Sequence, residues 1–328
     1  IQEEAGDGLR VYYSEGCHLS QDRMEPLALR QDRLSEAVAV AQCSDVVILC
    51  VGLDETLEGE EGDSSNNYAS GDKADLLLPQ SQRELMEAVM QVGKPVIVVN
   101  LTGSAMDLRY AQEHAAAIVQ AWYPGARGGR MVAKILFGEL APSGKLPVTF
   151  YQDGSELPDF EDYSMTAHKG RTYRYFQGNV LYPFGYGLTY GSARAETVSY
   201  QGTCHGAAPE EGLSPECTEP DRMMVRVFNP GSSPVQEVVQ VYVKAEPPYG
   251  VPNGRLCGFA RVSLKPGERI WFSVPMDPDT FTVIDPEGRK LAPGGAFWFS
   301  VGFGQPDERT KELTGGEWIE FTVQKNMA

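Results

Sequence analysis

Three runs of apolar residues constrain the fold of the first half of this chain more than any other feature. They occupy residues 46–51, 95–99 and 117–122, and the first two consist largely of valine and isoleucine. Continuous apolar runs of this length are typical of strands that are buried on both faces of a sheet. We expect helices between and after them, at 80–92, 107–113 and 129–137. Alternating strands and helices predict an α/β domain with a mostly parallel sheet.

The second half of the chain has a different pattern. From residue 138 to about 190, proline, glycine and aromatic residues dominate, and no helical period is present. From residue 223 onward, short alternating runs are separated by turn signals such as Asn229-Pro230-Gly231, which is typical of an antiparallel β-sandwich. A chain of 328 residues suits two domains. We expect an α/β sandwich domain over 1–150, an interdomain segment over 151–190, and a β-sandwich over 191–328.

Composition excludes several classes of function. The formal net charge of −17 argues against a nucleic-acid partner, because phosphate binding requires clustered Lys and Arg. The sequence has no apolar run of the ~20 residues that a membrane helix needs, so no membrane role is expected. The six cysteines form no CxxC pair, which argues against a zinc site. Free thiols suit a reducing compartment, so we expect a cytoplasmic location.

An acidic segment, GLDETLEGEEGD at residues 52–63, directly follows the first apolar run. The carboxyl end of a strand is where ligands bind in an open α/β sheet. A Ca²⁺ or Mg²⁺ site is one reading, although the spacing does not match an EF-hand. A solvated charge run is another. General acid catalysis is the third, because neighbouring carboxylates raise the pKa of a glutamic acid and keep it protonated near neutral pH.

Motifs spread along the chain resemble glycoside hydrolase family 3, of the β-glucosidase/β-xylosidase type. The sequences GLDETLEGE at 52–60 and LLLPQSQ at 76–82 resemble that family's acid/base loop and the helix start after it. Further matches follow in order, at 121–125, 136–138, 142–150, 170–175, 181–190, 237–243 and 258–262. The last two resemble the family's fibronectin type III-like domain. The chain is identified as the C-terminal portion of such an enzyme, without its N-terminal (β/α)8 barrel.

The resemblance implies roles for several residues of the acidic segment. The second Glu of the Glu58-Gly59-Glu60 group matches the family's acid/base, so we expect Glu60 to have this role, with Glu58 as the alternative. Glu61 departs from the commoner pattern, in which a small residue follows the acid, and the choice among the three stays open. We expect Thr56, Glu58 and Tyr68 to bind substrate. The polar stretch that contains Tyr68 is either a rim of the sugar pocket or a solvent-exposed loop.

The function implied is that of a retaining, exo-acting β-glycosidase that removes terminal non-reducing β-linked sugars, with no cofactor and no metal. A β-glucosidase is expected first. The alternatives are a β-xylosidase or arabinosidase of the same family, or a non-catalytic carbohydrate-binding module. In this family the nucleophile is an Asp on the barrel, so the chain alone is expected to be inactive. Its expected partners are a glycoside or oligosaccharide substrate and a barrel, supplied in cis or as a separate chain.

A missing barrel would have to pack directly against the acidic loop, because retaining enzymes hold their two carboxyl groups only ~5–5.5 Å apart. We therefore expect an exposed, partly apolar face. Its expected members are Leu57, Tyr68, Tyr123 and the aromatic segment 173–190.

Overall fold

The computed structural model describes residues 1–58, 73, 75–159, 161–202 and 221–326. The chain divides into two compact units. The first unit comprises residues 1–140 and 150–156, and the second comprises 141–149 and 157–328. The domain boundaries expected near residues 150 and 190 stay predictions.

A three-stranded parallel sheet forms the centre of the first unit, in the order β1-β2-β3. Strand β1 (Val47–Gly52) pairs with β2 (Val96–Leu101), which pairs with β3 (Ala117–Gln120). Side chains of β2 are inaccessible to solvent at Val98 and nearly so at Val99, as expected for a central strand covered on both faces. The expected α/β class with a mostly parallel sheet is confirmed.

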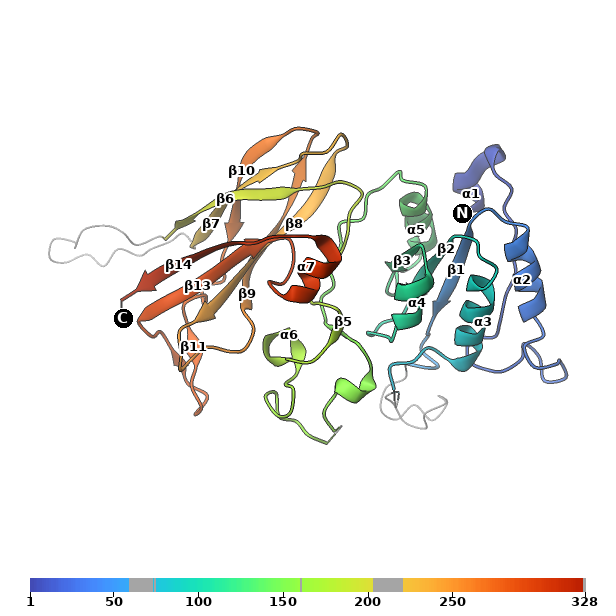
Figure 1. Ribbon diagram of the computed structural model, residues 1–328, viewed down its shortest axis with the longest axis horizontal. Helices are drawn as coiled ribbons and strands as arrows, with labels where there is room; N and C mark the ends of the chain where they lie inside the picture. The colour runs from blue at the N-terminus through green and yellow to red at the C-terminus, as the bar shows by residue number, and fades with distance from the viewer. Residues whose placement is uncertain (59–72, 74, 160, 203–220, 327–328) are drawn as a thin grey trace. The chain divides into compact units, whose positions relative to one another are not determined.

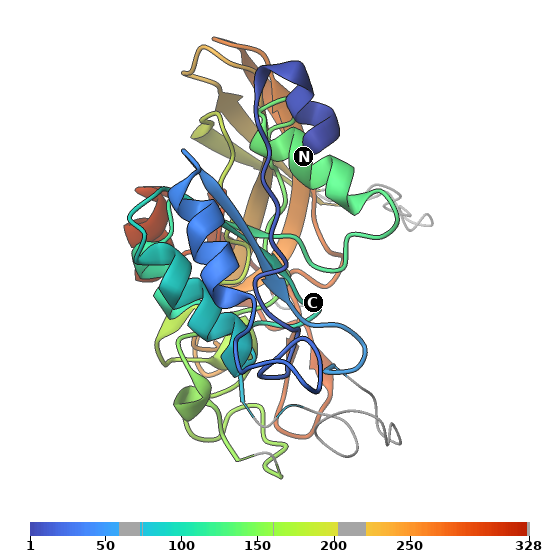
Figure 2. The same ribbon diagram turned by 90° about the vertical axis from the view of Figure 1, so that its right-hand side faces the viewer.

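Helices lie on both faces of this sheet (Figures 1 and 2). Helices α2 and α3 lie side by side on one face, and α5 lies on the other. The helices of the first unit are α1 (Gln2–Ala5), α2 (Leu34–Gln42), α3 (Gln80–Met90), α4 (Arg109–His114) and α5 (Gly128–Leu136). Short pieces complete it, namely η1 (Gly6–Gly8), β4 (Phe150–Tyr151) and η2 (Gly154–Glu156).

Gln82, on the first turn of α3, fixes the point where β1 leaves the sheet. Its side chain is buried, with 3% of its surface exposed. The amide oxygen accepts a hydrogen bond from the Gly52 N–H (2.8 Å), and the amide nitrogen donates to the carbonyl oxygens of Gly52 and Leu19 (2.7 Å each). A Cβ at Gly52 would lie 2.0 Å from the Leu101 carbonyl oxygen, so only glycine fits there.

The second unit is an antiparallel β-sandwich, as expected. One sheet has the strand order β10-β7-β6 and the other has the order β14-β13-β8-β9. Their buried side chains form one core that includes Val225, Val241, Phe297 and Phe299. The strands are β6 (Arg194–Gln201), β7 (Arg222–Phe228), β8 (Val235–Ala245), β9 (Arg255–Leu264), β10 (Arg269–Pro275), β13 (Gly295–Gly302) and β14 (Ile319–Lys325).

Shorter elements flank this sandwich. They are α6 (Thr172–Tyr175), β5 (Val180–Tyr182), β11 (Val283–Ile284), β12 (Lys290–Leu291) and α7 (Glu308–Thr314). No helix in the described part of the chain is both long and apolar enough to span a bilayer.

A buried ion pair joins the segment 141–149 to the sandwich. Lys145 Nζ lies 2.7 Å from Glu237 Oε1 on β8, and the two side chains are only 11% and 9% exposed. The same ammonium donates to the Gly187 carbonyl oxygen (2.6 Å), while the Glu237 carboxylate accepts from the Val238 N–H (2.8 Å). Further hydrogen bonds therefore satisfy both buried charges, as such a pair requires.

The Gln82→Leu variant tests the clamp on β1. It keeps a similar volume but leaves the N–H and C=O of Gly52 without their amide partner, so we expect the free energy of unfolding to fall by about 2–3 kcal/mol. Gln80→Ala, on the exposed side of the same helix, is the control and should change it by less than about 0.5 kcal/mol. Urea unfolding followed by circular dichroism measures both, and equal effects would contradict the role of Gln82.

The Lys145→Met variant tests the buried ion pair. Glu237 is left as a buried charge without its partner, and we expect a loss of about 3–5 kcal/mol in the free energy of unfolding. The double variant Lys145→Met/Glu237→Leu removes both charges and should recover most of this loss. Thermal unfolding of the two proteins checks this, and a single variant as stable as the wild type would refute it.

Candidate active site

The candidate site lies at the carboxyl ends of the three parallel strands. Gly52 at the end of β1 is in register with Leu101 at the end of β2, and Asn100 is in register with Gln120 at the end of β3. The chain therefore leaves all three strands at the same edge of the sheet. Ligands bind at this edge in open α/β sheets.

A layer of buried amides supports the loop that follows β2. Asn100 is fully buried, and its side-chain N–H₂ donates to Thr102 Oγ1 (3.0 Å) and to Gln120 Oε1 (2.7 Å). Gln120 in turn donates to the Thr102 carbonyl oxygen (3.2 Å). These bonds fix the backbone just before Gly103 and Ser104.

The acidic segment begins with one tight turn. Asp54 Oδ1 accepts from the Thr56 N–H (2.9 Å) and hydroxyl (2.6 Å), and the Asp54 carbonyl oxygen accepts from the N–H groups of Leu57 (3.0 Å) and Glu58 (2.9 Å). Leu57 is only 2% exposed, so its side chain anchors the turn in the interior. The turn carries Glu58 toward the ends of the two neighbouring strands.

The Glu58 carboxylate collects three hydrogen bonds from those strand ends. Glu58 Oε2 accepts from the Gly103 N–H (2.9 Å) and from the Tyr123 hydroxyl, and Oε1 accepts from the Ser104 hydroxyl. A Cβ on Gly103 would lie 2.8 Å from the Tyr123 ring and 3.1 Å from Glu58 Oε2. Glycine at this position therefore permits the close approach of the other two side chains.

Tyr123 follows a residue with an unusual backbone conformation. Trp122 has φ +55°, a region that side-chain-bearing residues rarely adopt, and its ring packs edge-to-face against Phe150 at 6.2 Å between centroids. Half of the Tyr123 surface is exposed, but its hydroxyl faces Glu58. Burial raises the pKa of Tyr123 well above its ordinary value. The hydrogen bond to Glu58 and the charge of that carboxylate raise this pKa further.

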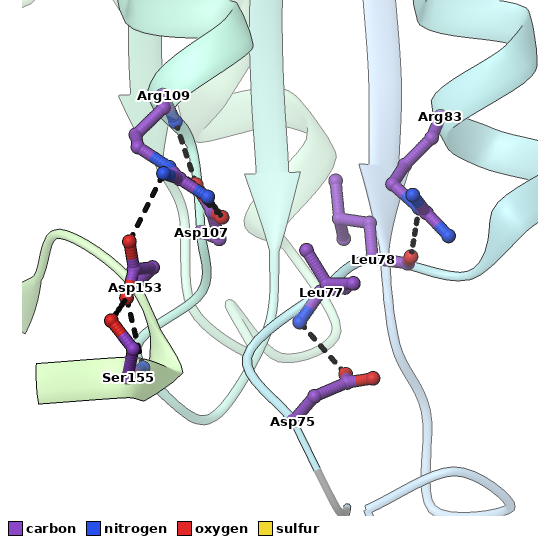
Figure 3. Close-up of polar contacts among 8 residues, drawn as sticks. All are labelled: Asp75, Leu77, Leu78, Arg83, Asp107, Arg109, Asp153 and Ser155. Carbon is purple, nitrogen blue, oxygen red and sulfur yellow. Dashed lines mark hydrogen bonds and ion pairs between the residues drawn. The ribbon is translucent and has the colours of Figure 1, made fainter. Parts of the chain in front are cut away.

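Polar contacts also hold the chain where it enters α3 (Figure 3). Lys73 donates to the Leu77 carbonyl oxygen and lies 3.5 Å from the Asp75 carboxylate. Asp75 accepts from the Leu77 N–H (2.9 Å), and Arg83 donates to the Leu78 carbonyl oxygen (3.0 Å). Burial lowers the pKa of Lys73, and the nearby Asp75 carboxylate opposes that shift.

Two other carboxylates of the first unit share one cation (Figure 3). Arg109 binds Asp107 (2.6 Å) and Asp153 (3.1 Å), and Asp153 also accepts from the Ser155 N–H (2.8 Å). Both carboxylates are therefore ion-paired to the start of α4. Neither is therefore free to direct a proton at a substrate, as a general acid must.

The residues that the sequence singled out meet different outcomes. Glu60 and Tyr68 lie outside the described residues, so their roles stay predictions. Glu58 is brought to the strand ends, and Thr56 is engaged in the turn with Asp54. The expectation that Leu57 belongs to an exposed apolar face is wrong, because this side chain is buried, with 2% of its surface exposed.

The other described members of that expected face differ in how exposed they are. Tyr123 is 51% exposed and Tyr190 is 56% exposed, in agreement with the expectation. Tyr182, in the same aromatic segment as Tyr190, is only 7% exposed and stacks on Tyr186 at 5.4 Å. Much of this aromatic segment therefore packs internally.

Sequence reasoning did not identify the partners of Glu58. Gly103, Ser104 and Tyr123 lie 45, 46 and 65 residues further along the chain. The available signal was their position, because each lies within five residues of the end of a predicted parallel strand, and such strands all end at one edge.

Other sites are less suited to catalysis. Within the described ranges, no group of three or more His, Cys, Asp or Glu side chains is placed to hold a metal ion. A hollow of about 520 Å³ on the second unit is lined by Trp298, Ser300, Thr322 and Glu320 among others. Glu320 is the one carboxylate among its described lining residues, so the hollow lacks the carboxyl pair that glycoside hydrolysis commonly uses.

Comparison with known proteins shows which family this chain is similar to. Residues 1–190 match the model of the glycosyl hydrolase family 3 C-terminal domain, and residues 237–305 match a fibronectin type III-like domain. A xylan 1,4-β-xylosidase of Xylanibacter ruminicola is 36% identical over 282 residues, which is 85% of this chain and 31% of the relative. A periplasmic β-glucosidase of Salmonella typhimurium is 29% identical, over 92% of this chain and 40% of the relative.

Solved structures agree with this assignment. The structure of a β-glucosidase from Erythrobacter marinus matches 97% of this chain with a TM-score of 0.75 and 29% identity, and the match covers 41% of that protein. The chain thus spans less than half the length of the relatives it matches. From its parallel sheet with the acidic loop through its β-sandwich, this chain belongs to glycosyl hydrolase family 3 and comprises that family's C-terminal and fibronectin type III-like domains.

Proposed function

We propose that this chain supplies the acid/base half of the active site of a retaining, exo-acting β-glycosidase, with Glu60 as the acid/base. The observation that supports this most is that three other carboxylates of the first unit are engaged by protein groups. Asp54 is used in its turn, Glu58 accepts three hydrogen bonds, and Asp107 is paired with Arg109. Glu60, two residues beyond Glu58, is the carboxyl group that the family resemblance assigns to this task.

In the proposed reaction, Glu60 first acts as an acid. It donates its proton to the glycosidic oxygen while the bond from that oxygen to the anomeric carbon breaks. An Asp carboxylate on a preceding (β/α)8 barrel attacks the anomeric carbon and forms a covalent glycosyl-enzyme. The ionised Glu60 then removes a proton from water, which displaces the Asp and releases the sugar with retained configuration.

The substrate class follows from the relatives only in part. Their names include both β-xylosidases and a β-glucosidase, and the two sugars differ by one hydroxymethyl group. A difference of that size is decided by the shape of the pocket. We propose a β-glucoside as substrate, with a β-xyloside or arabinoside as the alternative.

The Glu60→Ala variant of the full-length protein tests the role of Glu60. We expect kcat/KM on an unactivated β-glycoside to fall by about 10²–10⁴-fold, because the leaving oxygen loses its proton donor. Added azide should restore turnover of a nitrophenyl glycoside and yield a β-glycosyl azide, since azide attacks the glycosyl-enzyme without a general base. Comparing nitrophenyl β-glucoside with β-xyloside identifies the sugar.

Glu55→Ala is the matched control, because Glu55 lies in the same acidic segment and is exposed. Its kcat/KM should equal that of the wild type. A Glu60→Ala enzyme with unaltered activity would refute the assignment. A full-length protein that binds these glycosides without hydrolysing them would favour a carbohydrate-binding module instead.

A further inference from the structure

We propose that Glu58 is a positioning residue, which ties the start of the acid/base loop to the ends of β2 and β3 and so sets the place of Glu60. The inference rests on the function proposed above and deepens it. It assigns Glu58 neither the proton transfer nor a substrate contact. Tyr123, Ser104 and the backbone of Gly103 are the other members of this anchor.

The partners of the Glu58 carboxylate argue against Glu58 as the acid. In all three contacts the carboxylate is the acceptor, and the donors are one backbone N–H and two hydroxyl groups. Both oxygens of the carboxylate are thereby directed at groups of the protein. A general acid must instead carry a proton and direct it at the leaving oxygen of the substrate.

The same contacts argue against Glu58 as a substrate ligand. An ionised carboxylate has about four acceptor positions, and protein donors occupy three of those of Glu58. A sugar hydroxyl would have to displace Ser104 or Tyr123 to make a second contact. Most of the acceptor capacity of this carboxylate is therefore used by the protein, which leaves about one position for a further contact.

The geometry also explains why an anchor is useful at this position. The turn at Asp54 and the buried Leu57 fix the backbone before Glu58. The carboxylate then ties its side chain to the loops that follow β2 and β3. Glu60 is only two residues away, and two residues span at most about 7 Å. A misplacement of about 1 Å can reduce a rate by about 10²-fold, so an anchor this close controls catalysis.

The contact between Glu58 and Tyr123 can be measured in the chain itself. Removing the Glu58 charge with Glu58→Gln should lower the pKa of Tyr123 part of the way toward its ordinary value, because burial remains. NMR of tyrosine labelled at Cζ follows this titration, with Tyr123→Phe assigning the signal among the 15 tyrosines. An unchanged titration would overturn the anchor.

The raised pKa of Tyr123 also predicts how the stability of the fold depends on pH. The pKa of Tyr123 is higher in the folded state than the ~10 of an unfolded tyrosine. The resulting stabilisation is complete below about pH 10 and is lost as the pH rises through the folded-state value. Across this alkaline range, the free energy of unfolding should fall less in Glu58→Gln than in the wild type. An equal fall would contradict the contact between Glu58 and Tyr123.

Kinetics of the full-length protein separate positioning from the other two roles. With a phenyl glycoside, whose poorer leaving group needs an acid, we expect Glu58→Gln and Tyr123→Phe to lower kcat by about 10–10²-fold with little change in KM. Azide should not rescue Glu58→Ala, because Glu60 is still present. Glu55→Gln is the exposed control and should behave as the wild type. Melting temperatures confirm folding, and Tyr123→Phe serves if Glu58→Gln does not fold.

The decisive experiment is a double-mutant cycle with Glu60→Ala. If Glu58 acts through Glu60, adding Glu58→Gln to Glu60→Ala costs less than about twofold, because there is no acid left to misplace. If the two losses multiply while Glu60→Ala alone remains impaired, Glu58 has an independent role and the inference fails, although the proposed function stands. If azide rescues Glu58→Ala and Glu60→Ala has the activity of the wild type, both the positioning role of Glu58 and the acid/base role of Glu60 are overturned.

Discussion

The parallel pairing of β1, β2 and β3 is the constraint on which the candidate site depends. Because the strands run in the same direction and in register, Gly52, Leu101 and Gln120 all end at one edge of the sheet. Residues far apart in the sequence therefore meet at this edge. Gln82 holds the end of β1, because its side chain binds both the N–H and the C=O of Gly52. Only glycine fits at that position. The contacts of Glu58 follow from this arrangement.

In the second unit, a buried ion pair attaches the non-repetitive segment 141–149 to the β-sandwich. Lys145 and Glu237 form a buried pair whose desolvation is costly, and Gly187 and Val238 supply the additional hydrogen bonds that offset it. The backbone repeats the attachment, since Leu146 exchanges two hydrogen bonds with the 185–186 turn (2.8 Å each). Residues 141–149 thereby belong to the sandwich although they lie between two segments of the first unit.

Much of this fold could be predicted from the sequence, because local patterns determine it. Apolar runs placed the parallel strands within one or two residues of their observed ends, and the turn signal at 229–231 separates β7 from β8. The run at 117–122 extended too far, since Trp122 takes a positive φ that ends β3 at Gln120. The family resemblance drew attention to Glu58 and Glu60, but long-range contacts give no local signal. The burial of Gln82 and Leu57, and the donors around Glu58, were therefore not predictable.

Glu58 and Glu60 illustrate how two similar residues in one short segment can differ in task. Glu58 accepts three hydrogen bonds from the protein, and Glu60 is assigned to the substrate. The most direct test of this division is the pH dependence of kcat/KM for the full-length protein on an unactivated β-glycoside. We expect an alkaline limb, caused by deprotonation of the acid, that disappears in Glu60→Gln and persists in Glu58→Gln. A limb that persists in Glu60→Gln would contradict it.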